Sequence, residues 1–195
     1  MIGIGIGIGL GPVRFLVVVM KECCYSFEIN NRRYNFLTAM IDGFGLWTPE
    51  LKVDAIPLRC NLFARGVDVN TLTCPVCSNR NESRDHVFFC CSLADEVWHN
   101  IRIWIGCNLP SFLSWEEFHS WIEASHLASA SKNKICAITV TLLWVIWRFR
   151  NGIAFNEPFC TRNNIVDLIK YFAYRWLKHR GQLVSNWNLW LLSPL

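Results

Sequence analysis

One short segment constrains this chain more than any other: CPVCSNRNESRDHVFFCC, at residues 74–91. It holds a Cys-x-x-Cys pair, a polar stretch, one histidine and two adjacent cysteines. Two thiolates this close in sequence can bind one metal ion from a single tight turn, with each sulfur about 2.3 Å from the ion. An imidazole nitrogen and a third thiolate would complete a tetrahedron around that ion. The segment therefore predicts a metal site made by Cys74, Cys77, His86 and one of the last two cysteines.

Cys90 and Cys91 can both reach such a site. The spacing favours Cys91, because it leaves four residues after His86, as in short Cys-x-x-Cys…His-x-x-x-x-Cys zinc knuckles. Cys91 also directly precedes Ser92, the expected N-cap of the next helix. Three thiolates and one imidazole fill the coordination sphere, which makes the predicted site structural rather than catalytic. One Zn²⁺ is the expected ion, because soft thiolates with imidazole suit zinc. The alternative is a set of core thiols beside an incidental histidine.

The chain has ten cysteines, which raises the alternative of a secreted disulfide scaffold. Such scaffolds are small and loop-rich, whereas this sequence carries long apolar helical patterns. Cys-x-x-Cys followed by His and Cys favours a metal site in a reducing compartment, the nucleus or the cytoplasm. The scattered cysteines are expected to be small buried apolar residues; they are Cys60, Cys107, Cys136 and Cys160.

Composition separates this chain from disordered proteins. Hydrophobic residues make up 52% of its 195 residues, charged residues only 17%, and ten residues are tryptophan, so a core can form. This high content of hydrophobic residues also predicts poor solubility for the chain alone. The net charge of +4 is mildly basic, with its densest groups at Arg148 and Arg150 and at residues 175–180. It permits contact with nucleic acid without requiring it.

The N-terminus, MIGIGIGIGLGPVRFLVVVM, is of low complexity. Glycine at alternate positions weakens a strand. A signal peptide is disfavoured because no basic segment comes first and Arg14 interrupts the apolar run. A membrane span is disfavoured because glycines and Pro12 interrupt the continuous run of about 20 apolar residues that a span needs. Residues 1–45 are therefore expected to form a poorly ordered extension, in which RFLVVVM could make one edge strand.

Helical patterns begin after this extension. A short helix is expected over 57–65 and ends before Gly66. The next helix should begin after Ser92, an N-cap with Asp95 in the capping-box position, and end at Gly106.

Three further elements follow. Ser114 and Glu117 form a second capping box. A third helix, over 131–151, is apolar on every side and is expected to be a buried central helix rather than a membrane span. The apolar C-terminal segment NWNLWLL should pack back on the helices, or else present a surface to a partner. A fourth helix, over 163–179, should bury one stripe, made by Ile165, Leu168, Ile169, Phe172 and Trp176.

These patterns predict a mainly α fold: a small Cys3His zinc-binding knuckle followed by a helical bundle or array. The expected organisation is the N-terminal extension over 1–45, a zinc-binding module over 46–106 and a C-terminal helical region over 107–195.

No catalytic residue is predicted. The sequence offers no Ser/His/Asp ordering, no phosphate-cradling glycine loop and no acidic cluster of the polymerase or nuclease kind. Neither a membrane nor a small-molecule substrate is expected as a partner. The remaining histidines have no cysteine or acidic residue at ligand spacing and are expected at the surface or at helix ends; they are His99, His119, His126 and His179.

The stretch RGVDVNTLTCPVCSNRNESRDHVFFCCSLADEVWHNIRIW resembles the zinc-binding domain that follows the reverse transcriptase in plant non-LTR (LINE-type) retrotransposons. The family pattern is an Arg-Gly-Val turn, Cys-Pro-x-Cys, a glutamate, a His…Phe-x-Cys segment and a helix with Ala-x-x-[apolar]-Trp. The segment WVIWRFRNGIAF, at 144–155, resembles the Trp-x-x-Trp-x-x-Arg-Asn helix that often follows. The first pattern falls on Arg65 to Val67, Cys74 to Cys77, Glu82, His86 to Cys91 and Ala94 to Trp98.

The resemblance implies a structural zinc module that assists a parent RNA-directed DNA polymerase in engaging nucleic acid. RNA, single-stranded DNA or a reverse transcriptase domain are the implied partners. Phe88 and Phe89 could stack on bases or pack in the core. The chain departs from the family after Lys52, where the usual helix is missing, and it lacks the paired catalytic aspartates. Two alternatives stay open: a protein-interaction or structural module, and a retrotransposon relic with no selected function.

Overall fold

The computed structural model describes residues 27–29, 32–34, 56–181 and 186–195. The chain divides into two units, Met1–Pro49 and Glu50–Leu195. In the first unit, β1 (Phe27–Ile29) and β2 (Arg32–Tyr34) pair antiparallel, with Phe27 opposite Tyr34. This short pairing lies inside the segment expected to be poorly ordered and was not predicted. The edge strand expected for RFLVVVM lies outside the described residues.

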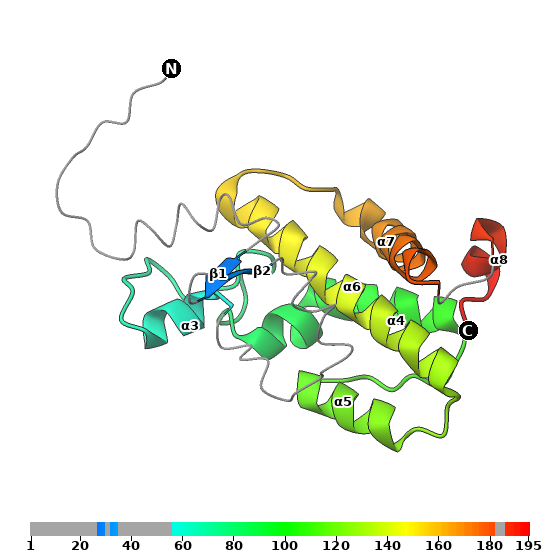
Figure 1. The fold of residues 1–195 in the computed structure, drawn as a ribbon. Helices are drawn as coiled ribbons and strands as arrows, with labels where there is room; N and C mark the ends of the chain where they lie inside the picture. Colours follow the sequence, from blue (N-terminus) through cyan, green and yellow to red (C-terminus); the bar gives the residue numbers. More distant parts are fainter. Residues whose placement is uncertain (1–26, 30–31, 35–55, 182–185) are drawn as a thin grey trace. The chain divides into compact units, whose positions relative to one another are not determined.

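The second unit is helical, as predicted, and carries the Cys3His cluster. Its elements follow the chain in Figure 1 as α3 (Arg59–Ala64), a π-helical turn (His86–Cys90), α4 (Ser92–Ile105), α5 (Trp115–Ala124), α6 (Ser129–Phe155), a 3₁₀ turn (Arg162–Asn164), α7 (Ile165–His179) and α8 (Trp187–Leu192).

The central element is α6, which is longer at both ends than the predicted helix. Residues 137–147 are buried without interruption, because α7 and the π-helical turn both pack on this helix. Figure 1 shows α7 lying along α6. Within the described ranges, no helix is both long and apolar enough to cross a membrane. The apolar run is thus the helical core, as expected.

The buried line of α7 differs from the predicted stripe. Ile165 and Ile169 are fully buried as expected, but the line continues through Ala173 and Leu177. Leu168, Phe172 and Trp176 are only half-buried. Small Ala173 at the centre of this line lets α7 approach its neighbours closely, and hydropathy alone gives little weight to an alanine.

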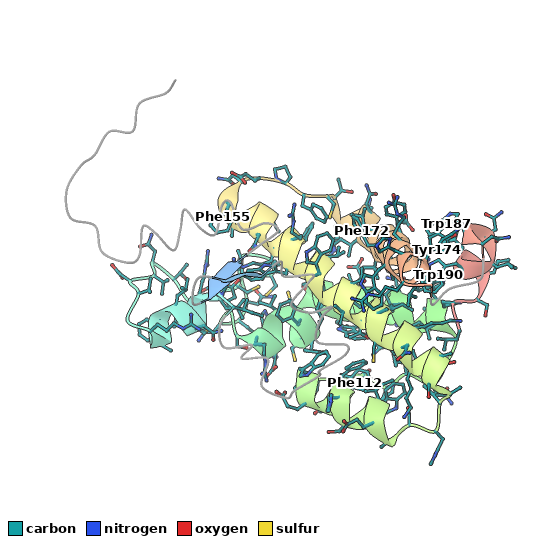
Figure 2. The ribbon with its side chains drawn as sticks, viewed as in Figure 1. Phe112, Phe155, Phe172, Tyr174, Trp187 and Trp190 are labelled. Carbon is teal, nitrogen blue, oxygen red and sulfur yellow. The ribbon has the colours of Figure 1, made fainter. Side chains whose placement is uncertain are left out.

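The C-terminal segment packs back on the helices, as predicted. Trp190 of α8 is fully buried, and its indole N–H donates to the Lys170 carbonyl at 2.9 Å. Tyr174 and Trp187 lie beside it, with ring centroids 5.1 Å apart (Figure 2). This aromatic cluster attaches α8 to the second half of α7.

Helix boundaries follow the predicted signals with one correction. Gly106 ends α4 at φ +68°, and the Ser114 hydroxyl accepts the Glu117 N–H. The Glu117 carboxylate accepts the Leu113 N–H at 2.7 Å and so completes that cap. Ser92, however, is the first helical residue rather than the N-cap. Cys91, with extended backbone, holds the cap position, because the chain leaves the π-helical turn one residue earlier than the capping pattern indicates.

Candidate metal centre

The Cys-x-x-Cys pair lies in a tight turn closed by a short hairpin. The Cys74 N–H donates to the Arg80 carbonyl at 2.8 Å, and the Glu82 N–H donates to the Leu72 carbonyl at 2.7 Å. Inside the loop the Ser78 N–H donates to the Cys74 carbonyl at 2.9 Å, and Ser78 has a left-handed backbone with φ +57°. This reversal turns both thiols of the pair to the same side.

The π-helical turn brings His86 and Cys91 together. The Cys91 N–H donates to the His86 carbonyl at 2.6 Å, a bond that spans five residues instead of the four of an α-helix. Residues five apart therefore share one side of this turn. Cys90 is rotated away, and its Sγ lies 3.6 Å from the Leu113 carbonyl. The structure thus places Cys91, and not Cys90, beside His86.

The four predicted ligands converge. The Sγ atoms of Cys74, Cys77 and Cys91 and a ring nitrogen of His86 all lie within 4.8 Å of one another. The Cys77 Sγ is 3.2 Å from His86 Nε2. A tetrahedral zinc ion needs ligand atoms about 3.5–3.8 Å apart, given its bond lengths to sulfur and nitrogen. The arrangement is consistent with one zinc site.

The protonation of the cluster without metal is unequal. A hydrogen bond to Cys91, together with burial, raises the pKa of Cys74 to about 12. The same bond lowers the pKa of Cys91 to about 7, and the Leu93 amide at the start of α4 adds to this lowering. The two sulfurs thus share one proton over a wide pH range. His86 Nδ1 is buried and has no hydrogen-bond partner among the described residues.

Glu82 lies in the polar stretch between the cysteine pair and His86. Such a stretch is typical of a surface loop, but the Glu82 side chain is 0% exposed. Its two carboxylate oxygens accept from Nε and Nη2 of Arg150, each at 2.5 Å, and Oε2 also accepts the Arg59 N–H at 2.8 Å. The carboxylate therefore joins the hairpin of the knuckle to the first turn of α3 and to the second half of α6.

A signal for this pair was present in the sequence. Glu82 and Arg150 each belong to one of the two family patterns, the glutamate after Cys-Pro-x-Cys and the arginine of Trp-x-x-Trp-x-x-Arg-Asn. Buried charges are stable only when paired and hydrogen-bonded, so two charged pattern residues near apolar segments indicate a partnership. The guanidinium of Arg150 also lies 5.2 Å from the ring centre of Trp147.

The aromatic residues beside the cluster belong to the core. Phe88 and Phe89 are 3% and 4% exposed, so neither presents a ring face to solvent. Phe89 stacks on Trp98 at 5.7 Å, and the Trp98 indole N–H donates to the Phe88 carbonyl at 2.9 Å. Their role is to pack the π-helical turn against α4, which excludes them as a stacking platform for bases.

The other cysteines and histidines lie away from the cluster. All the cysteines in the described ranges are free thiols. The four scattered ones are half-buried rather than buried as predicted, and burial still raises the pKa of Cys136 to about 11. His99, His126 and His179 are exposed as expected. His119 lies one helical turn from Glu123, with Nε2 3.3 Å from the carboxylate, an acidic partner that was not predicted.

Comparison with known proteins adds one finding. No curated protein and no solved structure matches the chain significantly. One family model, described as zinc-binding in reverse transcriptase, matches residues 44–98. The matched stretch contains all four residues of the cluster and Glu82, and it ends at Trp98 in α4. Residues 44–98 of this chain thus match the zinc-binding domain of reverse transcriptases.

Proposed function

We propose that Cys74, Cys77, His86 and Cys91 hold one structural Zn²⁺. The observation that carries this proposal is the convergence of three thiols and one imidazole nitrogen within 4.8 Å, from two separate turns of one short segment. Such a donor set suits zinc and leaves no open position for water or substrate. The ion would hold the hairpin of the knuckle against the start of α4, whose N-cap is the ligand Cys91.

The proposed role of this zinc module is to help a reverse transcriptase of a plant LINE-type element engage RNA or single-stranded DNA. The match of residues 44–98 to the family model described as zinc-binding in reverse transcriptase supports the link to a reverse transcriptase. The net charge of +4 supports the second. No catalytic step is assigned to this chain, because a closed Cys3His sphere stabilises structure and offers no site for chemistry.

Native mass spectrometry of the purified chain, with Cys90→Ser and Cys91→Ser compared, tests the metal assignment. We expect one bound zinc in the unmodified chain and in Cys90→Ser, and loss of zinc in Cys91→Ser. The Cys90 variant is a matched control because it makes the same chemical change one residue away. Zinc retained in Cys91→Ser and lost in Cys90→Ser would reverse the assignment. No zinc in the unmodified chain would refute the proposal.

A second candidate function is docking on another protein. Four aliphatic residues of α4 and α8 are exposed, and the Trp104 indole N–H donates to the Leu191 carbonyl at 3.0 Å, which places the two helices side by side. They are Ile103, Leu189, Leu191 and Leu192. Co-elution with a reverse transcriptase domain after nuclease treatment, lost in Leu189→Ser/Leu192→Ser, would favour this function. Co-elution that disappears on nuclease treatment would favour the nucleic-acid role.

A further inference from the structure

The net charge of the chain is concentrated at its C-terminal end. Residues 1–167 contain fifteen Lys or Arg and fifteen Asp or Glu, so their formal charge is zero. Residues 168–195 contain Lys170, Arg175, Lys178 and Arg180 and no acidic residue, which accounts for the whole net charge of +4. The excess positive charge is therefore located on α7 after Asp167 (in the first turn of that helix) and just beyond its C-terminal end, rather than on the zinc knuckle.

The other dense basic group is not available to a ligand. Arg150 is 3% exposed and binds both oxygens of the Glu82 carboxylate. The Arg148 guanidinium lies over the Phe159 ring at 4.6 Å and is half-buried. These cations are used inside the fold, which leaves the charge of α7 as the stronger candidate for binding.

Cations and aromatic rings alternate on one face of α7. Tyr171, Arg175 and Lys178 are separated by four and three residues and so share a face. Arg175 and Lys178 are exposed, and Tyr171 is 42% exposed. The Arg175 Nη1 donates to the Tyr171 hydroxyl at 3.1 Å. Trp187 of α8 packs edge-on against Tyr171, with centroids 6.2 Å apart. We call Tyr171, Arg175, Lys178 and Trp187 the α7 strip.

We infer that the α7 strip binds single-stranded nucleic acid, with phosphates on Arg175 and Lys178 and a base beside the ring of Tyr171. This inference rests on the proposed nucleic-acid role and assigns it to a surface other than the zinc knuckle. Cationic grooves with aromatic platforms are the common means of holding unpaired strands. A membrane is a poorer fit, because a helix that lies on lipid buries its apolar face there, and that face of α7 is already buried in the core.

The test is fluorescence anisotropy of labelled oligothymidylate and oligouridylate with the zinc-loaded chain at several salt concentrations. Each phosphate neutralised on a single strand contributes a slope of about −0.7 to the dependence of log K on log salt. Arg175→Gln/Lys178→Gln should therefore reduce the slope by about 1.4 and weaken binding about 25-fold at about 0.1 M salt. Tyr171→Leu should weaken binding about 5- to 150-fold and leave the slope unchanged.

Lys132→Gln/Lys134→Gln, which removes the same charge from α6, is the matched control and should leave binding nearly unchanged. An equal loss of oligonucleotide affinity in the two double variants would overturn the inference. Polyglutamate that competes for the chain as well as an unlabelled oligonucleotide does would also overturn it. So would binding to anionic lipid vesicles in place of the oligonucleotides. Native mass spectrometry of each sample separates the two proposals: a zinc-loaded chain that binds no strand refutes the α7 strip alone, whereas a chain without zinc refutes the proposed metal site.

Discussion

The proton shared by Cys74 and Cys91 determines how metal affinity depends on pH. Metal binds thiolates, so any thiol proton must leave. The pKa of Cys74 is about 12 and that of Cys91 about 7. Between these values binding displaces at least the Cys74 proton, and below pH 7 it displaces the Cys91 proton as well. Affinity should thus rise with pH at least tenfold per unit above pH 7, and more steeply, about a hundredfold per unit, below it.

Calorimetric zinc titrations in buffers with different ionisation enthalpies measure this proton release. At pH 8 the expected value is at least one proton per zinc, and it should increase at pH 6. A release that stays constant across pH 7 would mean that Cys91 holds its proton like an ordinary thiol. Cys90→Ser provides the control, since Cys90 lies outside the cluster.

Breaking the Glu82–Arg150 pair should be costly, because both side chains are buried. Removing one member leaves an unpaired buried charge, which costs about 3–5 kcal/mol. Glu82→Gln and Arg150→Met should each lower the free energy of unfolding by about that amount, measured by urea denaturation of the zinc-loaded chain. The double variant should lose less than the sum of the two single losses, because no lone charge then remains.

The pair between Glu96 and Arg162 provides a matched comparison. It also joins a glutamate to an arginine of a distant segment, but the two side chains are 50% and 49% exposed. Water and salt screen such a pair, so Glu96→Gln should cost no more than about 1 kcal/mol. Equal losses in Glu82→Gln and Glu96→Gln would show that burial is not what makes the first pair important.

At the scale of single helices, the two serine caps should differ in strength. The Ser114 hydroxyl accepts the Glu117 N–H at the start of α5, so Ser114→Ala should lower the free energy of unfolding by about 1 kcal/mol. Ser92 lies inside α4 and Cys91 occupies the cap, so Ser92→Ala should change stability by only a few tenths of a kcal/mol. A larger loss from Ser92→Ala than from Ser114→Ala in thermal denaturation would contradict these boundaries.

The sequence predicts helices well where one physical cause dominates. Apolar periodicity identifies α4, α6 and α7, and glycine in the left-handed region marks the end of α4 at Gly106. Ligand spacing also selects Cys91, because the four intervening residues match the π-helical turn that carries His86 to the same side.

Features that depend on tertiary contacts were predicted less well. Glu82 follows Cys74 in a polar loop, and only its partner on α6, sixty-eight residues away, explains its burial. The buried line of α7 runs through Ala173, whereas hydropathy favours the larger Phe172 and Trp176. Local pattern specifies which segments are helical, but their neighbours decide which side chains are inside.

Over the second unit as a whole, the Cys3His cluster and the helical core are connected at two places. Cys91 is at once a predicted ligand and the N-cap of α4, and Glu82 links the knuckle hairpin to α6 through Arg150. By contrast, α6 and α7 pack on each other through their own apolar faces. Loss of metal should therefore act first on the knuckle and the start of α4, and less on the paired central helices.

Hydrogen exchange with and without a chelator tests this division directly. On zinc removal we expect the amides of residues 59–82 to lose protection, because the buried residues of this stretch are Cys74 of the cluster and Glu82, and α3 has no buried residue. The amides of residues 137–147 in α6 should keep most of theirs, because this stretch is buried by α7 and the π-helical turn together. Cys91→Ser should reproduce the pattern without chelator, and Cys90→Ser should not. Equal loss of protection in both regions would mean that zinc is required for the whole helical unit to fold.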